Sequence, residues 1–135
     1  MAILSTATTS VSTISIDTAG IVDWVYNPGA LVTLTEAREE IGIAEDLVAR
    51  HGGQARLLID IRQIQSVSGP ARKLFSSDAT SDLGAVGLAL LVDSVFSKVI
   101  GNFYMTVNRP KHITRLFTDK ALAISWLASL PGRST

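Results

Sequence analysis

Three times in its second half the chain passes from a short apolar run directly into residues that favour the start of a helix. The runs are 57–60, 88–94 and 116–119, and they end on Asp60, Asp93-Ser94 and Thr118-Asp119. These side chains cap helices by accepting hydrogen bonds from unpaired backbone N–H groups. Repeated steps from strand to helix to strand need crossover connections, which make neighbouring strands parallel. The second half therefore predicts an α/β sheet.

The first half adds a hairpin and a helix. Runs 11–17 and 21–26 are rich in β-branched and aromatic residues, and Thr18-Ala19-Gly20 between them predicts an antiparallel turn. A helix is predicted from its cap at Thr35 to the glycines after His51. The predicted order is β-β-α-β-α-β-α-β-α. This is a single α/β domain with a mostly parallel five-stranded sheet, an N-terminal β-hairpin and about four helices, with later strands at 55–60, 86–92 and 113–117 and helices from 69, 94 and 118.

Length and composition favour one hydrophobic core. The chain has 135 residues, of which 47% are hydrophobic, and two half-sized domains would each bury too little surface. The expected domain spans 10–131, preceded by a flexible arm at 1–9 and followed by a tail at 132–135. Because the first strand is rich in Ser and Thr and poor in charge, it lacks protection as a sheet edge. Pairing with a second copy, as a homodimer, is therefore expected.

Charge and cysteine content exclude several classes of function. Twelve basic and twelve acidic residues balance to a formal net charge of zero, so no overall field attracts nucleic acid or an anionic membrane. No stretch reaches the roughly twenty apolar residues of a membrane span, and stable membrane association is not expected. The chain has no cysteine, which excludes disulfides and thiol nucleophiles. A cytoplasmic location is expected.

Several segments carry a resemblance to a known family. They are Leu34-Thr35-Glu36, Leu57-Leu58-Ile59-Asp60, and Arg115-Leu116-Phe117-Thr118-Asp119 followed by Ala121 and Trp126-Leu127. With the element order, they resemble STAS-like domains, and within these the SpoIIAA-like (STAS/SEC14-type) group of small bacterial proteins. The resemblance implies a regulatory or protein-interaction module without enzymatic activity. The implied partner is a kinase or an anti-sigma-like regulator.

The resemblance also implies a site. In the anti-sigma-factor antagonists of this class, a partner kinase phosphorylates a serine after the third strand, and the helix that begins there docks on the kinase. Here the corresponding positions are Ser66, Ser68 and Gly69, where Ser-Val-Ser-Gly replaces the Asp-Ser-Ser/Thr-Gly of that group. Ser68 has two interpretations, a phosphoacceptor or simply the cap of the next helix. The first predicts an exposed Ser68 and an exposed apolar patch at Ala71 and Phe75.

Charged residues suggest further sites, each with a structural alternative. Asp60 and Asp93 end two strands and would face one crevice if those strands are neighbours, where they would hold Mg²⁺ or serve as turn residues. A basic cluster would bind an anion or be a solvated loop. It consists of Arg109, Lys111, His112 and Arg115. A group of acids is expected on the solvated side of the first helix, namely Glu36, Glu39 and Glu40.

No catalytic pattern emerges, so neither an enzyme nor a cofactor or metal is predicted. A Ser-His-Asp arrangement, a phosphate-binding glycine loop and a metal-ligand spacing are all absent from the sequence. The SEC14-type resemblance suggests an alternative function, a carrier of a small apolar ligand or lipid, with a cavity near Phe96, Phe103 and Trp126. An enzyme using Asp60 and Asp93 is the third hypothesis.

Overall fold

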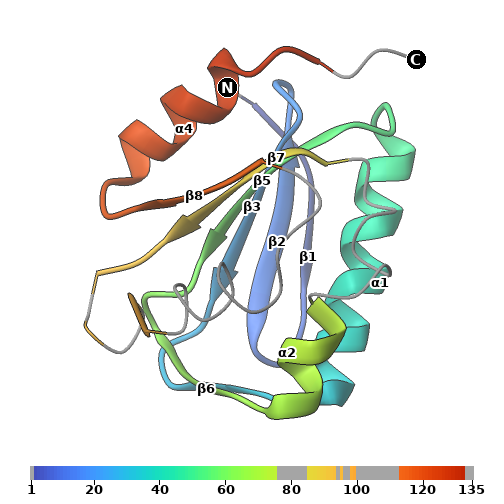
Figure 1. The fold of residues 1–135 in the computed structure, drawn as a ribbon. Coiled ribbons are helices and arrows are strands. Elements are labelled where there is room, and N and C mark those ends of the chain that lie inside the picture. Colours follow the sequence, from blue (N-terminus) through green and yellow to red (C-terminus); the bar gives the residue numbers. More distant parts are fainter. Residues whose placement is uncertain (1, 76–84, 94, 96–97, 100–112, 133–135) are drawn as a thin grey trace.

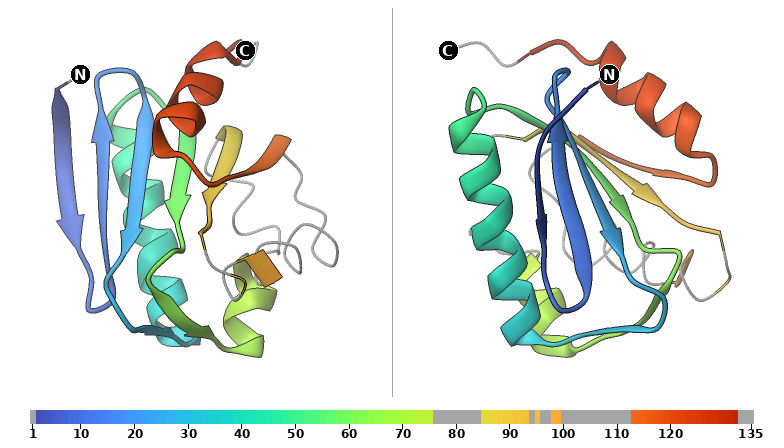
Figure 2. Two further views of the ribbon diagram at one scale, coloured as in Figure 1. Left: turned by 90° about the vertical axis from the view of Figure 1, so that its left-hand side faces the viewer. Right: turned by 180° about the vertical axis from the view of Figure 1, so that it is seen from behind.

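The chain forms a six-stranded sheet with helices on both faces (Figure 1). The computed structural model describes residues 2–75, 85–93, 95, 98–99 and 113–132. Helices α1 and α2 cover one face of the sheet, and α4 covers the other (Figures 1 and 2). The strands are β1 (Ile3–Thr8), β2 (Ser12–Asp17), β3 (Ile21–Tyr26), β4 (Ala30–Val32), β5 (Ala55–Asp60), β6 (Ile64–Val67), β7 (Ala85–Leu91) and β8 (Ile113–Phe117), and the helices are α1 (Leu34–Arg50), α2 (Gly69–Phe75) and α4 (Lys120–Ser129).

The sheet is mixed, with an antiparallel half and a parallel half. Its strand order is β1-β2-β3-β5-β7-β8, in which β1 to β3 are antiparallel and β3, β5, β7 and β8 are parallel. Strands β4 and β6 form a separate two-stranded parallel ribbon. The predicted α/β class and hairpin are confirmed, but the predicted set of five strands lacks β1, β4 and β6. Three helices are described instead of about four.

The N-terminal segment is a strand, so the expected flexible arm at 1–9 is wrong over most of its length. Strand β1 pairs with β2 from Ser5 opposite Ile16 to Thr8 opposite Thr13. The turn between them is organised by Thr9, whose Oγ1 accepts hydrogen bonds from the backbone N–H groups of Val11 (3.1 Å) and Ser12 (3.0 Å). A hydroxyl turn of this kind needs no glycine, which is why the hairpin was not recognisable from a glycine signal.

The second hairpin forms as predicted. The Asp17 carboxylate accepts hydrogen bonds from the N–H groups of Ala19 (2.8 Å) and Ile21 (3.0 Å), which folds the chain back on itself. Gly20 has a φ of 77°, a conformation that favours glycine. Alternate residues of β2 then point to the α1 side, and these are Ser12, Ile14 and Ile16, all buried.

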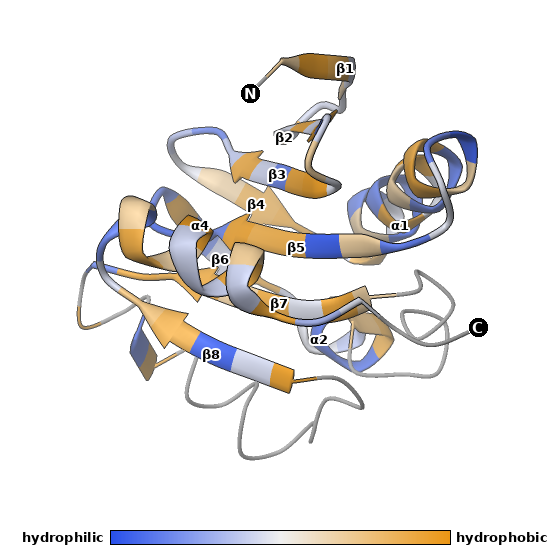
Figure 3. Cartoon of the chain, turned by 90° about the horizontal axis from the view of Figure 1, so that it is seen from above, coloured by the Kyte–Doolittle hydropathy of each residue, from blue (hydrophilic) through white to orange (hydrophobic). Residues whose placement is uncertain are grey.

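Helix α1 begins two residues earlier than predicted. Its cap is Thr33, whose backbone N–H and hydroxyl both donate to Oε1 of Glu36, at 3.1 Å and 2.7 Å. These bonds lower the pKa of Glu36, the side-chain bond being the larger cause. Thr35, the expected cap, lies inside the helix. The helix presents a hydrophobic side to the sheet and a hydrophilic side outward (Figure 3).

Strands β5 and β7 form the centre of the parallel half. Every residue of β7 is buried, as the apolar run at 86–92 predicts for a strand covered on both faces. Gly87 permits the close approach of α4, because an added Cβ would collide with Leu130 Cδ1 and touch Trp126. Close packing against α4 therefore explains a glycine within this strand.

Helix α4 closes the opposite face of the sheet. Its cap is Asp119, which accepts a hydrogen bond from the N–H of Leu122 at 3.1 Å, so the predicted cap at Thr118 is off by one residue. Its inward residues are Ala123 and Leu127. Trp126 also packs against this core, while Ala121, Leu122 and Ser125 are exposed. Apolar residues occur on nearly every side of the helix, so their spacing in the sequence does not show which side packs against the sheet.

Arg56 joins α4 to the sheet across more than seventy residues of chain. From β5, its Nε donates to the carbonyl oxygen of Leu127 (2.9 Å) and its terminal nitrogen to that of Leu130 (2.8 Å). These carbonyls lie at the C-terminal end of α4, where a cation is favoured by the helix dipole. At the other end of the helix, Lys120 forms an ion pair with Asp23 of β3 at 3.0 Å.

Some of the predicted features fall on residues that the structure does not describe. The predicted helix from Ser94 and the cavity residues Phe96 and Phe103 fall in segments whose side chains lie outside the described residues. Within the described part of the chain, no helix combines the length and apolar character needed to cross a membrane.

Candidate functional site

The β4–β6 ribbon and the start of α2 form one continuous surface beside the sheet. In the ribbon, Leu31 of β4 pairs with Ser66 of β6. Leu31 is 53% exposed, and Ser66 is also exposed. The N–H of Ser68 donates to the carbonyl oxygen of Val32 at 2.9 Å, which fixes the start of α2 against β4. We call this the ribbon surface and define it by Leu31, Gln65, Ser66, Gly69 and Pro70, all exposed.

Ser68 has the geometry of a helix cap. Its Oγ accepts a hydrogen bond from the N–H of Ala71 at 3.2 Å, and its carbonyl oxygen accepts one from the N–H of Arg72 at 3.0 Å. Ser68 is half-buried, whereas Ser66 is exposed. The expectation of an exposed Ser68 is therefore wrong, because the cap draws its side chain toward the helix. Whether either serine accepts a phosphate stays a prediction.

The expected apolar patch on α2 is not exposed. Ala71 is fully buried, and Phe75 is half-buried against the main core. The Phe75 ring packs edge-on against Trp24, with 6.1 Å between ring centroids. These two residues face the sheet because α2 packs against α1 and the core rather than standing out from them. The exposed apolar side chain of this region is Leu31 instead.

The strand-end acids are separated by an arginine. Strands β5 and β7 are parallel neighbours, as the crevice hypothesis requires. Asp60, 5% exposed, accepts a bidentate pair of hydrogen bonds from Arg62, from Nε at 3.0 Å and from a terminal nitrogen at 2.8 Å. The bond to Asp60 is the main reason why the pKa of Arg62 is raised, and the exposed Asp93 adds to it.

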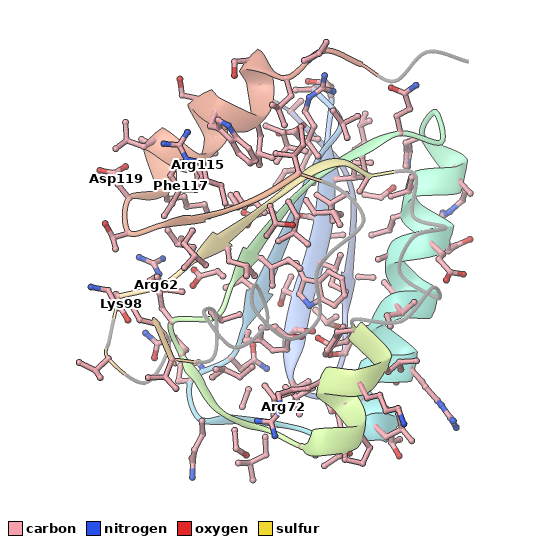
Figure 4. All side chains as sticks on the ribbon, viewed as in Figure 1. Arg62, Arg72, Lys98, Arg115, Phe117 and Asp119 are labelled. Carbon is pink, nitrogen blue, oxygen red and sulfur yellow. The ribbon has the colours of Figure 1, made fainter. Side chains whose placement is uncertain are left out.

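This arrangement favours the turn interpretation of Asp60. Its Oδ1 also accepts a hydrogen bond from the backbone N–H of Arg62 at 3.0 Å, so the carboxylate organises the chain where β5 ends. Within the described ranges, no cluster of three or more His, Cys, Asp or Glu is placed to hold a metal ion. Figure 4 shows Arg62 at the end of the sheet where β5 finishes, away from Arg72 on α2.

Of the four residues in the predicted basic cluster, the structure describes Arg115. Arg109, Lys111 and His112 lie outside the described residues. Arg115 of β8 is exposed, and its guanidinium lies 5.2 Å from the ring centroid of Phe117 and 6.0 Å from that of Trp126 (Figure 4). Cation–π contacts of this kind contribute about 0.5–1 kcal/mol at exposed sites. Arg115 therefore packs along the junction of β8 and α4.

A buried carboxylate beneath α1 is the functional group that sequence reasoning placed wrongly. Glu40 was expected on the solvated side of the helix with Glu36 and Glu39, but it is fully buried. Its Oε2 accepts hydrogen bonds from Ser12 Oγ (2.6 Å) and Trp24 Nε1 (2.9 Å). Its Oε1 accepts one from the Tyr26 hydroxyl (3.1 Å). Three donors from β2 and β3 thus hold α1 through one side chain.

Burial and hydrogen bonding act on Glu40 in opposite directions. Desolvation raises its pKa and is the largest effect, while the bonds from Ser12, Trp24 and Tyr26 lower it. The net shift is upward. Burial, with the nearby charge of Glu40, also raises the pKa of Tyr26 well above its usual range. Burial therefore makes the Glu40 carboxyl group harder to ionise, while the three hydrogen bonds hold it in place.

Replacing Glu40 with glutamine should remove a pH-dependent loss of stability. Because the pKa is higher in the folded chain, the wild-type free energy of unfolding falls as pH rises from the unfolded to the folded pKa, and stays lower above it. Glutamine keeps the network, since its oxygen accepts from Ser12 and Trp24 while its amide donates to Tyr26. Urea unfolding from about pH 4 to pH 8 should show the variant gaining stability relative to wild type as pH rises.

The matched control is Glu39→Gln on the exposed neighbouring position. This variant removes no acceptor from the buried network, and the Glu39 charge is only the smallest contribution to the raised pKa of Glu40, so its pH-dependent change should be smaller than that of Glu40→Gln. If the Glu40→Gln difference were constant over the same range, the upward shift in the Glu40 pKa would be contradicted.

A serine and a histidine far apart in sequence also meet. Ser5 Oγ lies 3.0 Å from Nε2 of His51, between β1 and the C-terminal end of α1. Within the described residues, no acid hydrogen-bonds to His51 to complete a triad, and both residues are half-buried. The pair joins the edge strand to the helix. Since the residues are 46 positions apart, no sequence spacing could have indicated it.

Comparison with solved structures identifies the class of fold. The chain is similar to an uncharacterised protein of the DUF3478 family with a SpoIIAA-like fold from Shewanella loihica PV-4, with a TM-score of 0.55 and 17% identity. The similarity covers 93% of this chain and 92% of that one. The chain therefore has a SpoIIAA-like fold, as the resemblance to STAS-like domains implies.

The family can be stated more narrowly. Residues 14–131 match the model of a domain of unknown function, DUF7793, and the chain belongs to this family. Comparison with curated proteins finds no match.

Proposed function

We propose that this protein is a non-enzymatic regulatory module that binds a protein partner through the ribbon surface. The observation that carries the proposal is Leu31, an exposed leucine held in a strand directly beside Ser66. An isolated exposed leucine is ordinary on protein surfaces, but Leu31 pairs with Ser66, which belongs to the segment where the family resemblance implies partner contact. The SpoIIAA-like fold supports the module class.

Charge favours an acidic partner. Between residues 61 and 75 the charged side chains are Arg62, Arg72 and Lys73, all basic. Arg62 is paired with Asp60, so the positive charge of this region is carried by Arg72 and Lys73 on α2, which begins beside β4. An apolar contact at Leu31 with basic side chains on the adjoining helix suits a partner whose surface combines an apolar pocket with Asp or Glu side chains, because complementary charge speeds and orients association. A kinase or an anti-sigma-like regulator, acting in the cytoplasm, is the proposed class of partner.

The ribbon surface also contains the candidate phosphoacceptors. Ser66 is exposed beside Leu31, and Ser68 caps α2. A phosphate on Ser66 would bring negative charge to a basic segment and oppose an acidic partner. The proposed regulation is therefore release of the partner by phosphorylation, which a Ser66→Glu variant mimics.

Replacing Leu31 with glutamate should weaken partner binding without unfolding the protein. The change removes the apolar contact and adds a charge that repels acidic groups, so affinity should fall at least about tenfold. The measurement is quantitative mass spectrometry of proteins captured from the source cells by tagged wild type, Leu31→Glu and Ser66→Glu. A captured protein that both variants lose is then purified and its affinity measured by calorimetry.

The control is Leu122→Glu, because Leu122 is 62% exposed on α4, on the other side of the sheet. It should retain the partner. The proposal fails if all captured proteins bind wild type and Leu31→Glu equally, or if the Leu122 variant alone loses them.

A further inference from the structure

The sheet has one edge that is open and uncharged. Strand β1 pairs with β2 on one side and ends the strand order of the sheet (Figure 2). Its residues are mostly exposed, with Ile3 at 65% and Leu4 at 48%. The chain carries no charged side chain before Asp17. Natural edge strands are usually protected by charge, proline or a covering segment.

Backbone geometry shows which groups face outward. The Thr9 N–H donates to the carbonyl oxygen of Ser12 at 2.8 Å, which closes the turn of the β1–β2 hairpin. Hydrogen-bonded residues alternate along an antiparallel pair, so Ala7 and Ser5 bond to β2. The N–H and C=O groups of Thr6 and Thr8 therefore point away from β2. This row of groups can bond to another strand.

The opposite edge differs in charge. Strand β8 carries the exposed Arg115, and α4 follows it directly and packs along it. A charged edge strand discourages pairing. Within the residues that the structure describes, the β1 edge has neither a charged side chain nor a helix packed along it. Because β1 is neutral along its whole length, it matches best an edge that is also neutral and equally rich in threonine, which a second copy supplies.

We propose that two copies of this chain pair through β1, antiparallel and about a two-fold axis, to join their sheets into one. The axis passes beside Thr6, so that Thr6 of each copy faces Thr6 of the other; the regular outward-facing row is Thr6 and Thr8, because the register of β1 with β2 shifts between Ile3 and Ser5. This register pairs outward-facing groups with outward-facing groups, and self-complementarity is what a two-fold interface requires. The paired strands extend the row of small hydroxyl side chains on the face of the sheet opposite α1, formed by Thr6, Thr8, Thr13 and Ser15.

The interface is separate from the ribbon surface. Strand β1 lies at the end of the sheet order, whereas the β4–β6 ribbon is a sheet of its own. Dimerisation and partner binding can therefore be tested independently. The Leu31→Glu variant should remain a dimer, and loss of the dimer should be separable from loss of the partner.

The first experiment measures mass in solution. Size-exclusion chromatography with light scattering of the wild-type chain should give twice the 14.4 kDa of one copy. Thr6→Lys places two ammonium groups opposite each other on the axis and should raise the dimer dissociation constant at least about tenfold. Ile113→Lys is the control, because Ile113 is 60% exposed on the β8 edge. Circular dichroism checks that both variants keep the fold.

The second experiment tests the register. The chain has no cysteine, so a single Thr6→Cys substitution introduces the only thiol. Facing hydrogen-bonded residues have Cα atoms about 5.5 Å apart, within the range of a disulfide. Mild oxidation should give a covalent dimer with Thr6→Cys and not with Ile113→Cys.

Three results would overturn the proposal. They are a wild-type chain that stays monomeric at high concentration, a dimer that Ile113→Lys disrupts and Thr6→Lys does not, and a dimer that Thr6→Cys fails to crosslink. If wild type is monomeric and β1 instead pairs with a strand of a different protein, the second copy is not the occupant.

Discussion

Replacing Glu40 with alanine should lower the free energy of unfolding by about 3–5 kcal/mol. The substitution leaves three buried donors without their acceptor, on Ser12, Trp24 and Tyr26. Each unsatisfied buried group costs about 1–3 kcal/mol, and the empty space beneath α1 adds to the loss. Removal of a buried charge offsets part of this cost. Urea unfolding followed by circular dichroism measures the change.

Glu39→Ala is the matched control, because it removes the same side chain from the next, exposed position of α1. It should change stability by no more than about 0.5 kcal/mol. Equal effects at the two positions would show that the Glu40 network contributes nothing beyond helix propensity.

Replacing Arg62 with methionine should destabilise the fold by about 2–3 kcal/mol. The reason is that Asp60, whose side chain is only 6% exposed, would keep a buried charge without its bidentate partner. The Arg62 side chain itself is 34% exposed, so solvent reduces the loss below that of a fully buried pair. In the double variant with Asp60→Asn, much of the stability should return, because the amide oxygen still accepts the backbone N–H of Arg62.

A second ion pair provides the control for burial. Asp46 and Arg50 of α1 lie at the same 2.8 Å separation, but their side chains are 64% and 57% exposed. Arg50→Met should therefore cost no more than about 0.5 kcal/mol. The interpretation of Asp60 fails if the two arginine variants lose equal stability, or if the Asp60→Asn double variant shows no recovery.

The parts of the fold that were predictable are those with strong local signals. The hairpin of β2 and β3 has β-branched strands, an Asp and a glycine at its turn, and all three act within a few residues. The buried parallel strands β5 and β7 are recognisable because burial on both faces requires continuous apolar runs. Strand β1 lacks bulky residues, since an edge strand packs on few neighbours, so its sequence resembled a disordered arm.

The candidate site was less predictable because its contacts are long-range. The ribbon pairs segments more than thirty residues apart, and nothing local in Leu31 or Ser66 indicates a strand. For Glu40 a signal did exist. Positions 37, 40, 44 and 47 lie on one side of a helix, and three of them are Ala or Leu, so Glu40 falls on the apolar face. A carboxylate there needs donors, and Trp24 and Tyr26 supply them.

The two tryptophans of the chain stand on opposite sides of the sheet. Trp24 belongs to the layer beneath α1, with its ring nitrogen hydrogen-bonded to a carboxylate. Trp126 belongs to α4 and packs at a tilt against Phe117, with 5.5 Å between ring centroids. Indole emission depends on the polarity around the ring. The native protein thus contains one tryptophan probe in each of its two layers. Intrinsic fluorescence can therefore follow the order in which the two layers unfold, without an attached label.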